Sequence, residues 1–164
     1  MSGFRCGVCG KPHDDLPRDI AFRRPDPYFG VPEAERERRV RCNDDLCMID
    51  DTECFIRGVL YLPFADGSGQ FGWGAWAHVS DVDFERYMDA WDNGTEDGVP
   101  PFPARLASAL DPYPGSFGLA VTVKLHSGGQ RPLFTVVSEQ HPLGVDQRVG
   151  ITEEKAHSFV ARWA

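Results

Sequence analysis

The chain lacks any long apolar stretch and any excess of positive charge. None of its apolar runs approaches the ~20 residues that a membrane-spanning helix needs. Its formal net charge is −8 and its isoelectric point is about 5.0, whereas non-specific binding of nucleic acid needs a basic surface. These absences argue against a membrane span and against nucleic acid as a partner. The same acidity suits a basic protein partner.

Two further absences concern the redox compartment. The first residues, MSGFRCGVCGKPHDD, contain no apolar core of a secretory signal. There are five cysteines, an odd number that fits a framework of paired disulfides poorly. In a reducing compartment, closely spaced cysteines more often bind metal or carry redox chemistry. We therefore predict a cytoplasmic protein.

The common catalytic signatures are also missing. The sequence contains no GxGxxG, P-loop, GxSxG or HExxH pattern, so it lacks the usual markers of nucleotide binding, serine hydrolysis and zinc-dependent proteolysis. Its histidines are scattered, and none has an evident nucleophile nearby in the sequence. Motifs alone therefore assign no reaction.

What the sequence does contain is the patterning of one globular domain. Its 164 residues, 41% of them hydrophobic and 26% charged, are ordinary for a single domain over residues 1–164. Apolar runs at residues 55–64 and 71–79 flank the turn-rich segment ADGSGQ, which predicts a β-hairpin. Strands at residues 117–125 and 132–137 predict a second hairpin.

Helical signals complete the predicted fold. A charged segment after Pro32 has few apolar residues and predicts a short surface helix. Apolar residues at helical spacing follow the potential N-caps Ser80 and Thr152 and predict two amphipathic helices. Residues 103–110 are predicted to form a short helix and residues 141–150 a loop. The expected fold class is α+β, with a mainly antiparallel sheet from two hairpins and helices packed on it.

The most specific local signal is the CxxC pair Cys6 and Cys9, and each of these cysteines is followed directly by a glycine. This spacing lets two thiolates bind one metal ion. A structural zinc site needs four ligands, and we favour His13 and Cys47 as the other two. Cys42 in place of His13 would complete a four-thiolate site, and the sequence does not choose between them. A redox pair and unliganded thiols are the other interpretations of the CxxC.

The metal hypothesis divides the domain into two parts. Residues 1–50 would form a zinc-ribbon-like N-terminal lobe held by the metal, and residues 51–164 would form the α+β body. The lobe lacks a strong apolar period, so it would bind the body weakly by itself. A metal ligand at the edge of the first core strand would therefore contribute directly to local folding free energy.

Three residues of the first predicted hairpin are candidates for binding. Arg57 interrupts an apolar strand, where a buried guanidinium must be paired by a carboxylate of the acidic cluster Asp50, Asp51 and Glu53 or by an anionic ligand. Trp73 and Trp76 most simply belong to the core, as does Trp91. The first two stand beside glycines, and an exposed tryptophan pair there would mark a binding surface.

The motifs FRCGVCGKPH, PEAERERR, LCMIDDTECFIRGVLYLP, FGWGAW, FERYMDAW, YPGSFGL, RPLF and HPLGVDQRVGIT occur in this order over nearly the whole chain. Together they resemble an uncharacterised bacterial family, the domain of unknown function twenty-one ninety-nine. The resemblance implies a cytoplasmic bacterial single-domain protein and supplies no activity. It matches the four favoured metal ligands. It also makes His141 and Gln147 candidates for a structural or binding role.

Taken together, the sequence favours a non-catalytic binding or regulatory protein with a structural zinc site and a basic protein partner. Two alternatives stay open. One is a small enzyme with a pocket near Arg57, His78 and His141, beside the acidic cluster at residues 50–51. The other is a thiol redox protein that uses the CxxC pair.

Overall fold

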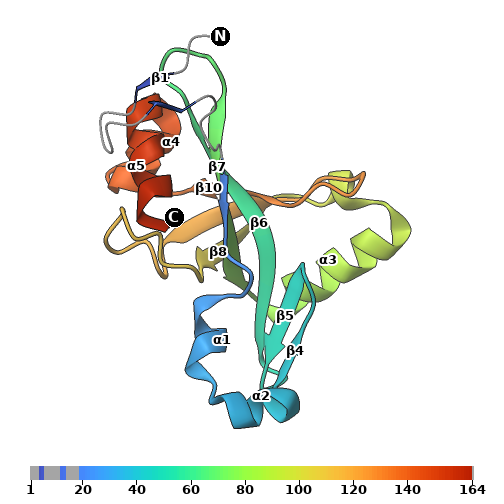
Figure 1. The fold of residues 1–164 in the computed structure, drawn as a ribbon. Helices are drawn as coiled ribbons and strands as arrows, with labels where there is room; N and C mark the ends of the chain where they lie inside the picture. Colours follow the sequence, from blue (N-terminus) through green and yellow to red (C-terminus); the bar gives the residue numbers. More distant parts are fainter. Residues whose placement is uncertain (1–3, 6–11, 14–18, 164) are drawn as a thin grey trace.

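A closed five-stranded barrel with additional strands forms the centre of the molecule (Figure 1). The computed structural model describes residues 4–5, 12–13 and 19–163, and the side chains of residues 19–161. The strands are β1 (Phe4–Arg5), β2 (Pro12–His13), β3 (Asp19–Ala21), β4 (Val40–Cys42), β5 (Leu46–Ile49), β6 (Glu53–Pro63), β7 (Gln70–Val79), β8 (Phe102–Leu106), β9 (Ala120–Lys124) and β10 (Leu133–Val136). The helices are α1 (Asp26–Gly30), α2 (Glu33–Arg39), α3 (Asp81–Asn93), η1 (Glu96–Gly98), α4 (Pro142–Val149) and α5 (Glu153–Trp163).

The long β6–β7 hairpin organises the main sheet, in the order β3-β7-β8-β9-β10-β6-β5-β4. An additional pairing between β6 and β7 closes the barrel of β6, β7, β8, β9 and β10. Antiparallel pairs predominate, but β3 runs parallel to β7 and β10 runs parallel to β6, so the sheet is mixed. The fold class is α+β, and both predicted hairpins are confirmed.

The helices lie around the two ends of this hairpin. Figure 1 shows α4 and α5 together at one end, α1 and α2 toward the other, and α3 on the side of β6 that carries β4 and β5. The predicted helices after Pro32, Ser80 and Thr152 are confirmed. The main core lies in the barrel and beneath α3 and α5, and a second cluster around Phe55 and Trp76 covers the other face of the hairpin.

Two local predictions were wrong. Residues 102–106 form a strand, because Phe102, Ala104 and Leu106 alternate with exposed neighbours and bury one face of the strand. Residues 142–149 form α4 rather than a loop. In that helix Pro142 occupies the first turn, where a missing N–H costs nothing, and the preceding residue caps the helix.

Glycines let strands approach closely at two places. A Cβ at Gly74 would lie 3.0 Å from the Cβ of Ala21, so this glycine lets β3 lie close against β7. A Cβ at Gly58 would lie 2.5 Å from the Phe134 ring and 2.7 Å from the Pro132 carbonyl oxygen. Closure of the barrel between β6 and β10 therefore depends on Gly58.

The described parts of the predicted lobe form two separate sheets. Residues 19–49 belong to the main sheet, through β3 on β7 and through β4 and β5 on β6. Before them, β1 pairs antiparallel with β2. The rest of the zinc-ribbon-like segment lies outside the described residues, so that part of the fold stays a prediction. Within the described residues, no helix is both long and apolar enough to cross a membrane.

Candidate functional site

A cavity of about 280 Å³ lies between α3 and the turn that joins β4 to β5. Its walls are mainly apolar. They comprise Asn43, Asp45 and Leu46 from the turn and Tyr87, Met88, Trp91 and Asp92 from α3. The volume lies just below the range of about 300–1,000 Å³ that is typical of sites for drug-sized ligands. The cavity therefore suits one side chain or a small molecule.

Backbone hydrogen bonds hold the turn wall in one conformation. The Asn43 side-chain oxygen accepts from the N–H of Asp45 at 2.8 Å and of Leu46 at 2.7 Å, a local arrangement that fixes tight turns. The Arg57 N–H donates to the Asp45 carbonyl at 2.9 Å, and the Arg57 guanidinium donates to the Asp44 carbonyl at 3.1 Å. This wall is therefore ordered without a ligand.

Two side-chain contacts add to this order. A disulfide joins Cys42 to Cys47, which lie opposite each other in β4 and β5. The Arg131 Nε donates to the Asp45 carboxylate at 3.2 Å. This ion pair connects the turn to the segment just before β10, so the wall is tied to the barrel.

The helix wall is fixed by caps at both ends of α3. The Ser80 side chain accepts from the Asp83 N–H at 3.1 Å, and Gly94 ends the helix in the left-handed conformation with φ 67°. Between these caps, the Tyr87 and Trp91 rings meet edge to face with centroids 6.0 Å apart. Trp91 is 45% exposed, so an aromatic surface borders the cavity.

Two buried polar groups at this corner lack partners. Tyr87 is 3% exposed, and its hydroxyl has no hydrogen bond within the described part of the chain. Burial raises the pKa of Tyr87 well above its ordinary value, and the Asp45 and Glu96 carboxylates raise it further. Glu96 in η1 is 4% exposed, and its Oε1 likewise has no partner among the described residues.

Arg57 lies beside this corner without lining the cavity. Its guanidinium is paired by the Asp44 carbonyl, and its Nε is buried without a partner among the described residues. Burial, and then the charge of Arg131, lower its pKa. The predicted pairing with the acidic cluster was wrong, because Asp50 binds Arg39 through two hydrogen bonds of 2.8 Å. That contact lowers the pKa of Asp50.

Of the three tryptophans expected in the core, two are buried and one is partly exposed. Trp73 and Trp76 are both 0% exposed, and the Trp76 indole donates to the Phe22 carbonyl at 2.9 Å. They are core residues and offer no surface to a partner. Trp91, which we expected in the core, is the partly exposed one, because it lies in the last turn of α3.

His141 and Gln147 hold α4 in place. The His141 Nδ1 accepts from the Leu143 N–H at 3.1 Å, which caps the helix. The Gln147 Oε1 accepts from the Val136 N–H at 2.7 Å, and its Nε2 donates to the Phe134 carbonyl at 3.0 Å. Of the two roles that the family resemblance leaves open for these residues, these contacts support the structural one.

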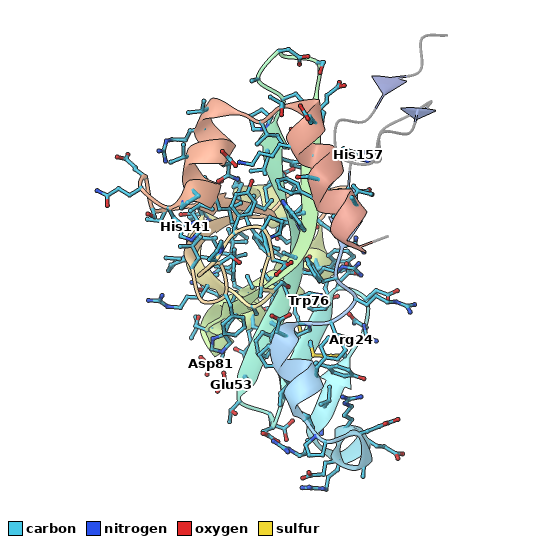
Figure 2. All side chains as sticks on the ribbon, turned by 60° about the vertical axis from the view of Figure 1, so that its left-hand side comes forward. Arg24, Glu53, Trp76, Asp81, His141 and His157 are labelled. Carbon is cyan, nitrogen blue, oxygen red and sulfur yellow. A yellow bond between two sulfur atoms is a disulfide. The ribbon has the colours of Figure 1, made fainter. Side chains whose placement is uncertain are left out.

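The three residues of the enzyme alternative have separate surroundings. His78 pairs with Glu53 and lines two shallow hollows with Arg105, whose linings include neither Arg57 nor His141. Figure 2 shows His141 near the α4–α5 end and Glu53 well away from it, toward the other end of the long hairpin. The structure does not assemble these residues into one pocket.

The predicted metal and redox centres fall mostly outside what the structure describes. Cys6 and Cys9 lie outside the described residues, and only the backbone of His13 is described. Cys47 is buried and bonded to Cys42. Over residues 4–5, 12–13 and 19–163, no group of three or more His, Cys, Asp or Glu residues is placed to hold a metal ion. The four-ligand site and the redox pair stay predictions.

Comparison with known proteins gives one match. A family model with the description "Uncharacterized protein conserved in bacteria (DUF2199)" matches residues 5–151. The match confirms the resemblance that the ordered motifs predict, and its span includes both walls of the cavity. No curated protein and no solved structure matches the chain.

Proposed function

We propose that this chain, which belongs to the bacterial family described as DUF2199, is a non-catalytic binding protein whose ligand enters the cavity between α3 and the β4–β5 turn. The observation that carries the proposal is Tyr87, a residue that lines the cavity and whose buried hydroxyl has no partner among the described residues. Leaving such a hydroxyl unpaired costs about 1–3 kcal/mol. Phenylalanine would avoid that cost, so the hydroxyl has a use when a ligand is bound.

The construction of the two walls supports the proposal. Hydrogen bonds and the Cys42–Cys47 disulfide order the turn, and caps fix α3. A site that is ordered before binding loses less conformational entropy when the ligand arrives. The partly exposed Trp91 supplies a large and rigid contact surface of the kind that dominates many binding interfaces.

The overall charge supports a basic protein as the partner. The formal net charge is −8, and Asp92 stands exposed at the cavity. An acidic surface steers a basic partner toward it and raises the association rate, an effect that salt weakens.

Protein-observed NMR tests this proposal. A chemically mixed set of small fragments, titrated into the full chain, should shift the amide signals of Leu46, Tyr87 and Trp91 more than those around the hollows at His78. The variant Trp91→Ala should remove most of that effect. The matched variant Phe117→Ala, at an aromatic residue that is 51% exposed elsewhere, should keep it. Fragments that cluster only at His78 would overturn the proposal.

A structural zinc ion bound by Cys6, Cys9, His13 and Cys47 is the second part of the proposal, and it rests on the CxxC spacing. A bound zinc would contribute folding free energy to the N-terminal segment. In the disulfide state Cys47 offers no thiolate, so the set of four fits only the reduced chain.

Elemental analysis of protein purified under reducing conditions, without added metal, tests the zinc site. We expect about one zinc per chain, lost in Cys6→Ser, with Cys54→Ser as the matched control because Cys54 is a buried free thiol of the body. Less than about half a zinc per reduced chain would remove this part of the proposal and leave the cavity unaffected.

A further inference from the structure

We infer that the occupant of the cavity is a positively charged side chain of a protein partner, an arginine guanidinium or a lysine ammonium. This inference rests on the proposed function and assigns the chemical class of the ligand. Aromatic rings, unpaired carboxylates and the size of the cavity point to it independently.

The aromatic wall is suited to a cation. Trp91 is 45% exposed and presents its ring at the cavity, and the buried Tyr87 ring packs edge to face against it. The face of an aromatic ring carries partial negative charge and attracts a cation, most strongly for tryptophan. Met88 adds an adaptable apolar surface for the methylene groups of a long basic side chain.

The cavity lining contains two carboxylates and no cationic side chain, although Arg57 and Arg131 contact its turn wall. Asp45 is paired with Arg131, whereas no ion pair is recorded for Asp92 or Glu96 within the described residues. Lys124 lies near η1, but its ammonium donates to the backbone carbonyls of Asp97 and Val99. An incoming cation would therefore meet the exposed Asp92 carboxylate, which forms no ion pair within the described residues.

Glu96 lies near this corner but does not line the cavity. It is 4% exposed, one of its oxygens has no partner among the described residues, and its charge acts on Tyr87. A buried carboxylate without a counter-charge is destabilising, and a cation held beside Tyr87 would relieve part of that cost. The Tyr87 hydroxyl can accept or donate a hydrogen bond.

The size of the cavity favours a single side chain of a larger partner. About 280 Å³ holds one extended basic side chain, and the net charge of −8 provides attraction for the rest of a basic surface. A partner that is anchored by one inserted residue and surrounded by weaker charge contacts has the usual pattern of a binding hot spot.

Blocked peptides with one variable residue between glycines test the inference on the full chain by NMR titration. The variable residue is arginine, lysine, citrulline or norleucine, where citrulline is the neutral counterpart of arginine. We expect the arginine or lysine peptide to bind at least five times more tightly than both neutral peptides, and to shift the amides of residues 43–46 and 87–92. Citrulline binding as tightly as arginine would overturn the inference.

Matched variants locate the charge effect. Asp92→Asn should weaken binding of the basic peptide about threefold, in the range of exposed ion pairs. Asp89→Asn, on the same helix but lining a different hollow, should leave it unchanged. Equal effects of the two variants would show only long-range attraction and would overturn the assignment to the cavity. Trp91→Ala should cost about tenfold, as expected for an aromatic residue at the centre of a binding site.

The outcomes separate the inference from the proposed function. If norleucine shifts the cavity amides as strongly as lysine, the cavity binds a ligand but not a cation, so only the inference falls. If neither peptides nor fragments shift those amides, both fall. A free alkylguanidinium that binds as tightly as the arginine peptide would overturn the protein partner as the source of the cation.

Discussion

Two buried tyrosines distinguish the two ends of the molecule. Tyr113 and Tyr87 are 2% and 3% exposed. The Tyr113 hydroxyl donates to the Asp146 carboxylate at 2.6 Å, and Lys155 donates to the same oxygen at 2.6 Å. The Tyr87 hydroxyl has no such bond within the described residues. A buried tyrosine hydroxyl is therefore hydrogen-bonded at the α4–α5 end, and another has no hydrogen bond within the described residues at the α3 corner.

The surroundings of the two tyrosines show the same contrast. At the α4–α5 end, His141 and Gln147 each use their side-chain nitrogen or oxygen atoms in hydrogen bonds to the backbone. A network whose members are all bonded specifies one arrangement of its elements. At the α3 corner, Glu96 repeats the unpaired state of Tyr87. The first pattern serves stability, and the second is what a binding site requires.

The largest expected effect tests the rigidity of the α4–α5 end. A Cβ at Gly144 would collide with the Ser138 carbonyl oxygen and lie 3.1 Å from the Val136 side chain. We expect Gly144→Ala to lower the free energy of unfolding by about 3 kcal/mol, because α4 must move off β10. Gly98→Ala is the control, since no heavy atom lies within 4 Å of its added Cβ. Urea denaturation measures both, and a loss below about 1 kcal/mol would mean that α4 adjusts freely.

A smaller effect is expected from removing one member of the satisfied network. Gln147→Ala leaves the Val136 N–H and the Phe134 carbonyl without their partner. The free energy of unfolding should fall by about 2 kcal/mol. Gln140→Ala is the matched control, because Gln140 is exposed and only its backbone N–H is hydrogen-bonded. If the two variants were equally stable, the bonds of Gln147 would not hold α4.

The tyrosines themselves should respond in opposite directions. Tyr113→Phe removes a hydrogen bond to a charged group and should cost about 1.5 kcal/mol, whereas Tyr87→Phe removes an unpaired hydroxyl and should stabilise the free protein by about 1 kcal/mol, the lower end of the cost given above. The same Tyr87→Phe should weaken binding of the basic peptide. A variant that gains stability and loses affinity marks a functional group. Destabilisation by Tyr87→Phe would show that the hydroxyl is already satisfied.

Alkaline pH gives the smallest of these effects. Burial raises the pKa of both Tyr87 and Tyr113 well above the ordinary value of 10.0. Because the folded-state pKa values are raised, the stabilisation is fully present below pH ~10 and is lost as the pH rises toward the folded values. By pH 10.5 each tyrosine should account for about 0.8 kcal/mol of lost stability. In urea denaturation at increasing pH, the free energy of unfolding of each Tyr→Phe variant should fall less steeply than that of the parent chain.

Local signals in the sequence predicted the parts of the fold that depend on near neighbours. Alternation on both sides of a turn predicted β6 and β7, and the Ser80 cap with its apolar spacing predicted α3. The failures at β8 and α4 were also local, since both segments contain proline near their starts. Pro103 indicates a helix start, but the alternation of buried and exposed residues in β8 outweighs that signal. Pro142 indicates a loop, but it occupies the first turn of α4.

The cavity was beyond such signals. Asp45 and Arg131, which join its turn wall to the barrel, are 86 positions apart. Only closure of the barrel brings them together, and that closure depends on a fit between Gly58 and Phe134 that no spacing pattern encodes. The helical spacing places Trp91 on the same face of α3 as Tyr87. Whether Trp91 is buried or exposed depends on which other elements pack against the end of that helix, and local spacing does not determine this.

The pairing of β6 with β10 has a consequence for the order in which the molecule assembles. The β6–β7 hairpin joins segments that are adjacent in the chain, whereas the contact between Asp45 and Arg131 closes a loop of 86 positions. Contacts between distant segments carry a larger entropic cost and form later in folding. A chain during synthesis therefore can form its longest hairpin well before residue 131 is available. The turn wall of the cavity is joined to the barrel by Arg131 only after the segment before the last strand has been made.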